Sequence, residues 1–188
     1  MSAETDLDPQ ELKYLALQSS RAQRPDQALN YLKLAIRQAP EDGELHYLLG
    51  AEHAQLGMYD RAAEEMAHAL TLAPGMHTAR LQLGLLYLTQ AQVAASTETL
   101  APLTLLPEND CFRYFAIGLL DLVHDRFPEC RVALGRGIAL NILNEPLNAD
   151  MRKIIDALPP PDAETKPSQA GPEENVWLSA YRQNDMPN

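Results

Sequence analysis

The side chains that could carry chemistry in this sequence are five histidines, two cysteines and a few acidic pairs. His46 and His53 are seven residues apart and share one face if the segment between them is helical. A zinc site needs a third and a fourth ligand converging on such a pair, and the sequence offers no full ligand set. We therefore interpret both histidines as partly buried packing residues and expect no metal site.

The sequence lacks the residue patterns of the common catalytic sites. Acidic pairs such as Glu64-Glu65 and Glu173-Glu174 are typical of solvated faces. No nucleophile elbow, phosphate-binding glycine loop or dinucleotide fingerprint occurs in the sequence. We expect no catalytic residue and no cofactor, and predict that the protein is not an enzyme.

Composition narrows the classes of partner. The formal net charge is −11, from 26 acidic and 15 basic residues, and no Lys/Arg block interrupts it, which argues against nucleic acid as a ligand. No run approaches eighteen apolar residues, so no membrane insertion is expected. The start, MSAETDLDPQE, is acidic and unlike a secretory signal, so we expect a cytoplasmic protein.

The secondary structure that positions these residues can be predicted from a sequence repeat of 34 residues. An aliphatic residue followed by a small one recurs at Leu15-Ala16, Leu49-Gly50, Leu83-Gly84 and Ile117-Gly118. Further along each unit, a small residue recurs at Ala28, Ala62, Ser96 and Cys130, and a large apolar one at Leu32, Met66, Leu100 and Leu134. Pro40 and Pro74 close the first two units, Pro107 closes the third one residue early, and Ile142 stands at this position in the fourth.

This pattern resembles the tetratricopeptide repeat, which has a Leu-Gly pair, a later Ala, a large apolar residue and a closing Pro. The resemblance covers about residues 9–144 and is best from Leu49-Gly50 to Pro74. The usual early aromatic survives only as Tyr114, and the usual Tyr after the Gly only as Tyr87. The resemblance implies an all-α fold, a right-handed helical solenoid of four helix pairs plus a C-terminal capping helix.

Apolar spacing near 3.6 residues predicts two helices in each unit. We expect them at residues 9–22 and 26–38, 43–56 and 60–73, 77–90 and 93–106, and 111–124 and 128–142. Pro102 should kink or end the sixth helix near Ala101. Gly137 falls where the repeat needs a small residue, whereas Gly135 has no such explanation. Cys111 and Cys130 are expected on the order of 10 Å or more apart, too far for a disulfide.

The regions outside the repeats have distinct compositions. We predict a last helix at about 149–158 with Asn148 as its N-cap and one apolar stripe formed by Leu147, Met151, Ile154, Ile155 and Leu158. The predicted organisation is an acidic arm at 1–8, four repeats at about 9–42, 43–76, 77–110 and 111–144, the capping helix within 145–158, a Pro-rich linker at 159–172 and a tail at 173–188.

The resemblance further implies that the first helix of each pair lines a concave groove. Only Lys13 and Arg21 could contribute there to a clamp for an acidic C-terminus, so the groove should instead hold an amphipathic or extended apolar segment. The alternative is that tight winding buries the same side chains within the protein. The residues expected to line the groove are Tyr47, Leu81, Leu85, Leu88, Phe112, Phe115, Leu119 and Leu122.

The tail contains Trp177, the only tryptophan in the chain. Val176, Trp177 and Tyr181 would share one face of a helix. Such a segment could dock in the chain's own groove, bind another protein, or remain a disordered tail that carries an aromatic residue.

These observations favour a protein-binding scaffold, an adaptor or a chaperone, whose partner is a partly apolar protein segment. In size, acidity and repeats the chain is similar, at the level of the fold, to the small chaperones of bacterial type III secretion. The alternative is a structural subunit of a homo- or hetero-oligomer, for example a homodimer, whose groove is closed by its own tail or by a second copy.

Overall fold

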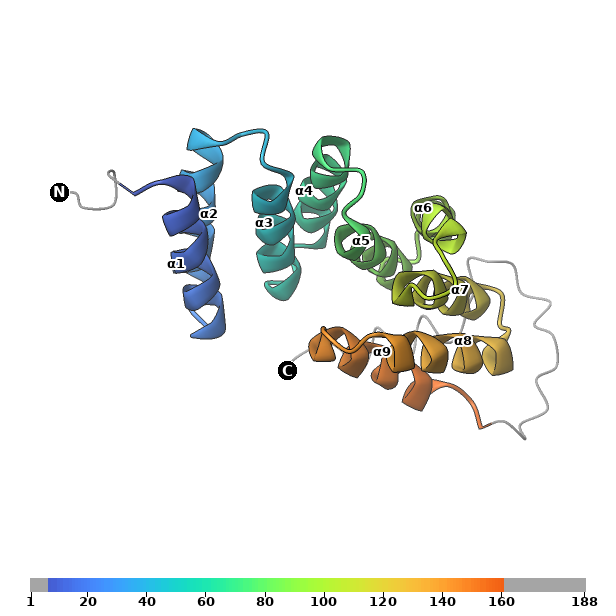
Figure 1. Ribbon diagram of the computed structural model, residues 1–188. Helices are drawn as coiled ribbons and strands as arrows, with labels where there is room; N and C mark the ends of the chain where they lie inside the picture. The colour runs from blue at the N-terminus through green and yellow to red at the C-terminus, as the bar shows by residue number, and fades with distance from the viewer. Residues whose placement is uncertain (1–6, 161–188) are drawn as a thin grey trace. The chain divides into compact units, whose positions relative to one another are not determined.

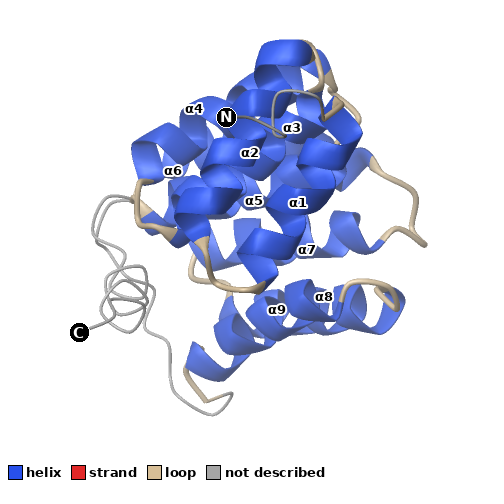
Figure 2. Ribbon diagram, turned by 90° about the vertical axis from the view of Figure 1, so that its left-hand side faces the viewer, coloured by secondary structure: helices blue, strands red, loops and turns tan. Residues whose placement is uncertain are grey.

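The computed structural model describes residues 7–160, and every regular element in that range is a helix (Figures 1 and 2). The tail segment with Val176, Trp177 and Tyr181 lies outside the described residues. The helices are α1 (Pro9–Arg21), α2 (Pro25–Gln38), α3 (Gly43–Gln55), α4 (Tyr59–Leu72), α5 (His77–Thr89), α6 (Val93–Leu100), the 3₁₀ helix η2 (Ala101–Leu105), α7 (Cys111–Val123), α8 (Phe127–Leu140) and α9 (Glu145–Ala157).

The helices α1, α3 and α7 begin after an aspartate at the same position of the 34-residue repeat. Asp8, Asp42 and Asp110 accept hydrogen bonds from backbone N–H groups in the first turns of α1, α3 and α7. Asn144 does the same for α9, accepting from the Leu147 N–H at 3.1 Å. An Asp or Asn at these positions satisfies N–H groups that have no partner within the helix, so it fixes where the helix begins.

The turn inside each helix pair also repeats. One residue per turn adopts a left-handed backbone, with φ between 54° and 71°, at Gln23, Gly57, Ala91 and Asp125. The N–H of the next residue bonds back to the carbonyl five residues earlier, for example from Met58 to His53 at 2.9 Å. This hydrogen bond is typical of a Schellman ending, so the second helix of every pair leaves the turn in the same way.

The sixth helix confirms the expected effect of Pro102. α6 ends at Leu100, and the chain continues as the 3₁₀ helix η2. Proline at the second position of η2 is tolerated because the first N–H groups of a helix need no partner within it.

The prediction for the last helix is wrong at its start. Asn148 is not the N-cap; it lies inside α9, is buried, and exchanges hydrogen bonds with Asn141 at 2.8–2.9 Å. The cap is Asn144, which stands one repeat length after Asp110. The expected apolar stripe packs inward: Leu147, Met151, Ile154 and Leu158 are buried, and Ile155 is partly buried against the same core.

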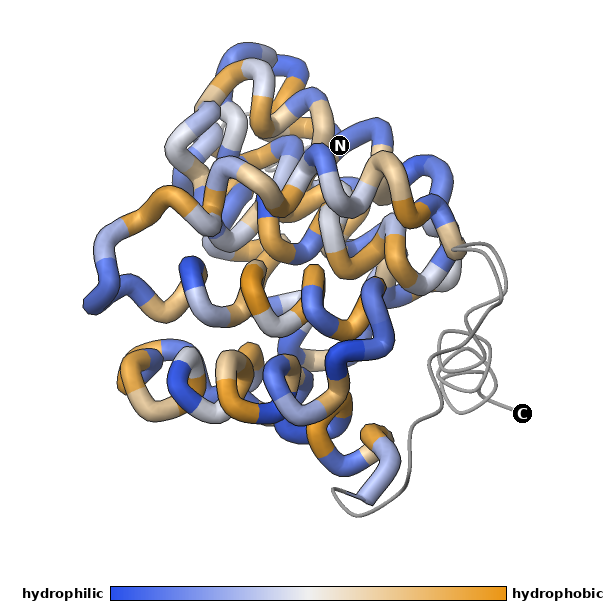
Figure 3. Tube along the Cα trace, turned by 90° about the vertical axis from the view of Figure 1, so that its right-hand side faces the viewer, coloured by the Kyte–Doolittle hydropathy of each residue, from blue (hydrophilic) through white to orange (hydrophobic). Residues whose placement is uncertain are grey.

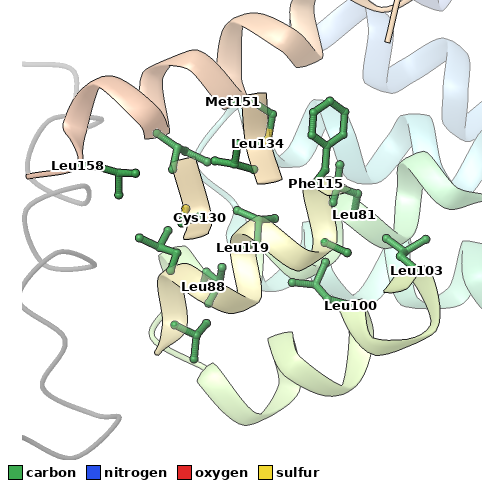
Figure 4. Close-up of a cluster of buried hydrophobic side chains, with 14 of the residues drawn as sticks. Leu81, Leu88, Leu100, Leu103, Phe115, Leu119, Cys130, Leu134, Met151 and Leu158 are labelled. Atoms are coloured by element: carbon green, nitrogen blue, oxygen red, sulfur yellow. The ribbon is translucent and has the colours of Figure 1, made fainter. Parts of the chain in front are cut away.

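Contacts divide the chain into two compact units, Met1–Arg80 and Leu81–Asn188. In the first unit, apolar side chains of α1, α2 and α3 form one core, which contains Leu12, Ala16, Leu32, Ala35, Leu45 and Leu49. In the second unit, side chains from α5 to α9 converge on a larger core around Phe115 and Leu119 (Figure 4). Each unit therefore has a hydrophobic core of its own.

Glycine allows the two helices of a pair to approach closely. A Cβ on Gly84 would lie 2.5 Å from Leu100 Cδ2, and one on Gly118 would lie 2.6 Å from Leu134 Cδ2. A Cβ added to Gly137 would lie 2.5 Å from Cδ1 and Cε1 of the Phe115 ring, which confirms its predicted packing role. Gly135 meets nothing within 4 Å, so packing does not explain it.

Figure 3 shows hydrophobic and hydrophilic stretches interspersed along the chain, as expected where helices bury one face and expose the other. Among the helices of residues 7–160, none is long and apolar enough to cross a membrane.

Candidate functional site

The second unit contains most of the residues predicted to line a groove, and it buries most of them. Leu81, Leu88, Phe115, Leu119 and Leu122 belong to the core of this unit rather than to an open surface (Figure 4). The apolar stripe of α9, including Met151 and Ile154, belongs to the same core. The prediction that these five side chains are open to a partner is therefore wrong, because the amphipathic α9 needs an apolar surface on which to bury its own stripe.

Three of the predicted groove residues remain partly exposed. Tyr47 lies on α3 in the first unit. Leu85 and Phe112 lie in the second unit, where both pack against the edge of its core. They are the part of the predicted groove that a partner could still contact.

A different groove is open between α7 and α8. It has a volume of about 390 Å³ and is mostly apolar. Tyr114 and Ile117 form its α7 wall, and Val132, whose side chain is 73 % exposed, stands on its α8 wall. The complete lining is Tyr114, Ile117, Asp121, Pro128, Glu129, Val132, Ala133 and Arg136.

Asp121 lies at the position of the fourth 34-residue repeat that Tyr87 holds in the third repeat. A carboxylate is much shorter than a tyrosine ring, so the space that an aromatic would fill stays open. Asp121 accepts hydrogen bonds from Arg126 Nη2 at 2.6 Å and Nε at 2.8 Å. This pairing satisfies the buried carboxylate and turns it toward the end of the helix pair.

Charged groups flank the apolar part of the groove. The Arg136 guanidinium lies 4.3 Å from the centroid of the Tyr114 ring, which is cation–π geometry. Glu129 lies on α8 seven residues before Arg136, which places the two backbone positions about 10 Å apart along the helix axis at 1.5 Å per residue. The groove therefore carries a cation toward one end and an anion toward the other.

The turn between α8 and α9 presents a second apolar feature. Ile142 and Leu143 are adjacent, 88 % and 93 % exposed. Asn141 holds the turn through bonds to the Asn144 carbonyl and the Asn148 side chain, at 3.0 and 2.9 Å. Large aliphatic side chains held out by an ordered polar network are typical of contact surfaces.

The histidines are packing residues, as the sequence predicts. His46 contacts Glu65 Oε2 through Nδ1 at 2.7 Å and the Pro40 carbonyl through Nε2 at 3.0 Å. His53 is 4 % exposed, and its Nδ1 has no hydrogen-bond partner in the structure. Burial, and then the charge of Lys33, lowers the pKa of His53. Neither environment provides a set of ligands: within residues 7–160 no group of three or more His, Cys, Asp or Glu could hold a metal ion.

The two cysteines are free thiols. Cys130 is completely buried, as expected for the small core residue of its repeat, and burial raises its pKa to about 12. Burial also raises the pKa of Cys111. Both side chains are therefore thiols rather than thiolates near neutral pH, which makes them poor nucleophiles.

Comparison with solved structures identifies the fold. The chain is similar to a MamA RS-1 ArsTM double mutant, with a TM-score of 0.62 and 19% identity over 98% of each chain. It is also similar to residues 41 to the end of MamA from Desulfovibrio magneticus RS-1, with a TM-score of 0.59 and 20% identity over 99% of each chain. The fold is a tetratricopeptide-type helical solenoid. No protein-family model matches the chain, and no curated protein matches it in sequence.

Within this tetratricopeptide-type fold, sequence reasoning missed the groove between α7 and α8. The available signals were departures from the repeat: Asp121 where Tyr87 stands one unit earlier, and Ile142 where a proline closes the other units. A third signal is Val132, an apolar residue on the exposed side of α8. Each of these departures leaves an exposed apolar side chain or an open space at a position where a repeat that follows the pattern would have neither.

Proposed function

We propose that this protein is a non-catalytic interaction scaffold, an adaptor or a chaperone, that binds a partly apolar segment of another protein. The observation that supports the proposal best is the open apolar groove between α7 and α8. Its exposed Val132 lies opposite Tyr114 and Ile117, on a helix pair whose inner faces belong to the core of the second unit. An open apolar surface of this kind on a folded protein is typical of an interaction site.

Recognition in this groove would combine an apolar anchor with charges at its ends. An aromatic or branched aliphatic side chain would bury Val132 and the exposed edge of Ile117, and each fully buried side chain of that size contributes about 1.5–3 kcal/mol. Arg136 and Glu129 would then set the orientation of the segment, since complementary charges specify register more than affinity.

The test is recovery of protein partners from native cells by the full chain and by two matched variants. Val132→Glu places a charge in the groove, whereas Leu105→Glu alters an equally apolar side chain, 85 % exposed, on η2. We expect Val132→Glu to lose at least tenfold in recovery of a partner that Leu105→Glu retains. Equal recovery by both folded variants would rule out the groove.

A second candidate function is supported by the turn between α8 and α9. Ile142 and Leu143 would suit the permanent contact surface of a structural subunit in a homo- or hetero-oligomer. Sizing of the purified chain at micromolar concentration tests this function in its homo-oligomeric form. An oligomer that dissociates in the Leu143→Asp variant supports it, and a monomer in the unchanged chain argues against self-association.

A further inference from the structure

The described part of the chain ends beside the helix that carries the groove. Arg131, on α8, donates to the Ile155 carbonyl at 3.1 Å and to the Pro159 carbonyl at 3.2 Å. These two bonds hold the end of α9 and the residues after it against α8. Residues 161–188 therefore continue from a point fixed next to the residue that precedes Val132.

The remaining chain is long enough to reach the groove. Sixteen residues lie between Pro160 and Trp177, and this stretch of chain can span roughly 50 Å at about 3.1 Å per residue. The whole of α8, with 14 residues, is about 21 Å long. Any point on the groove is thus within reach without a change in the helices.

The chemistry of the segment matches that of the groove. Val176, Trp177 and Tyr181 supply large apolar surfaces. The acidic pair Glu173-Glu174 precedes them, and Arg182 follows. Acidic residues on one side of the apolar group and a basic residue on the other complement the Arg136 and Glu129 ends of the groove.

We propose that the segment around Trp177 of the same chain occupies the groove between α7 and α8. The Trp177 ring covers Val132 and Ile117, Glu173-Glu174 lie toward Arg136, and Arg182 lies toward Glu129. Intramolecular docking is favoured because a short tether gives the segment an effective concentration near the millimolar range. The segment therefore competes with any partner for the groove, and this regulation rests on the proposed function of the groove.

Tryptophan emission of the full chain tests the docking, because Trp177 is the only tryptophan. We expect blue-shifted emission at low micromolar concentration that does not change on dilution. Val132→Glu should shift it to the position of the denatured chain, while Leu105→Glu should leave it blue-shifted. Emission like that of the denatured chain in the unchanged protein overturns the proposal, as does blue-shifted emission that Val132→Glu leaves unaltered. A shift on dilution overturns it too, because the groove would then hold the segment of a second copy.

Exchanging the charges of Arg136 and the Glu173-Glu174 pair tests the proposed orientation of the segment in the groove. Arg136→Glu should red-shift the emission, and adding Glu173→Arg and Glu174→Arg should restore it. Failure of the triple variant to restore the emission overturns the contact with Arg136.

The docking can fail separately from the function of the groove. If Val132→Glu loses a partner but leaves the Trp177 emission unchanged, the groove binds another protein and the segment does not occupy it. If the segment docks, Trp177→Ala should raise partner recovery at least several-fold, because it removes the competitor. Unchanged recovery in Trp177→Ala overturns the regulatory role.

Discussion

His53 is a buried side chain of the first unit with an unsatisfied ring nitrogen, and it should make stability depend on pH. Its pKa is lowered from 6.5, chiefly by burial. As the pH falls through about 6.5, the unfolded chain takes up a proton at this residue and the folded chain does not, so the free energy of unfolding decreases. The contribution of His53 to the free energy of unfolding is therefore fully present above pH 6.5 and decreases below it.

Denaturant unfolding between pH 7.5 and 5.5, in the unchanged chain and in His53→Gln, measures this effect. We expect a smaller loss of stability in His53→Gln on acidification. His124→Gln, at an exposed position, should retain the full pH dependence. An identical pH dependence in His53→Gln and the unchanged chain would contradict the assignment.

Ala91 is a residue in a conformation that suits glycine better, with φ of 56°. A non-glycine residue in the left-handed region costs about 1–2 kcal/mol, and the greater chain entropy of unfolded glycine offsets part of the gain from replacing it. Ala91→Gly should therefore raise the free energy of unfolding by about 0.5 kcal/mol. Gly57→Ala, at the equivalent turn, should lower it by about 1 kcal/mol, and chemical denaturation measures both.

At the scale of elements, the packing of α7 on α8 depends on Gly118. Its added Cβ would meet the fully buried Leu134, so Gly118→Ala should destabilise the second unit by about 1–3 kcal/mol. Gly135→Ala, on the open side of α8, should stabilise it by up to about 1 kcal/mol. Thermal unfolding of the pair gives shifts of opposite sign, and a stabilising Gly118→Ala would show that α7 and α8 do not approach as closely as described.

Because the first and second units of the molecule have separate hydrophobic cores, we expect a substitution in one core to destabilise mainly the helices of that unit. Leu119→Ala and Leu12→Ala each remove a fully buried side chain, at a cost of about 2–5 kcal/mol. Hydrogen exchange should show faster exchange mainly in α7–α9 for Leu119→Ala, and mainly in α1–α3 for Leu12→Ala. Uniform acceleration across all helices in both variants would instead indicate one cooperative unit.

The 34-residue repeat predicts the helix pairs well, because each position carries a local signal that survives in one sequence. Pro102 and Gly137 act as their types require. The cap of α9 is ambiguous in the sequence because Asn144 and Asn148 are the same residue type and have the same capping preference, although the phase of the repeat favours Asn144. The burial of Phe115 depends on contacts between helices distant in sequence, and no single helix pattern records them.

Binding of a protein partner in the α7–α8 groove is tested by placing a photo-crosslinking amino acid at position 132 of the full chain in its native cells. We expect a covalent adduct with a distinct second polypeptide from position 132, and far less from position 105, although Leu105 is more exposed than Val132, at 85 % against 73 %. Trp177→Ala in the same chain should increase that adduct. Adducts of equal yield from both positions, or none from position 132 in either background, would contradict the claim that the α7–α8 groove binds a protein partner.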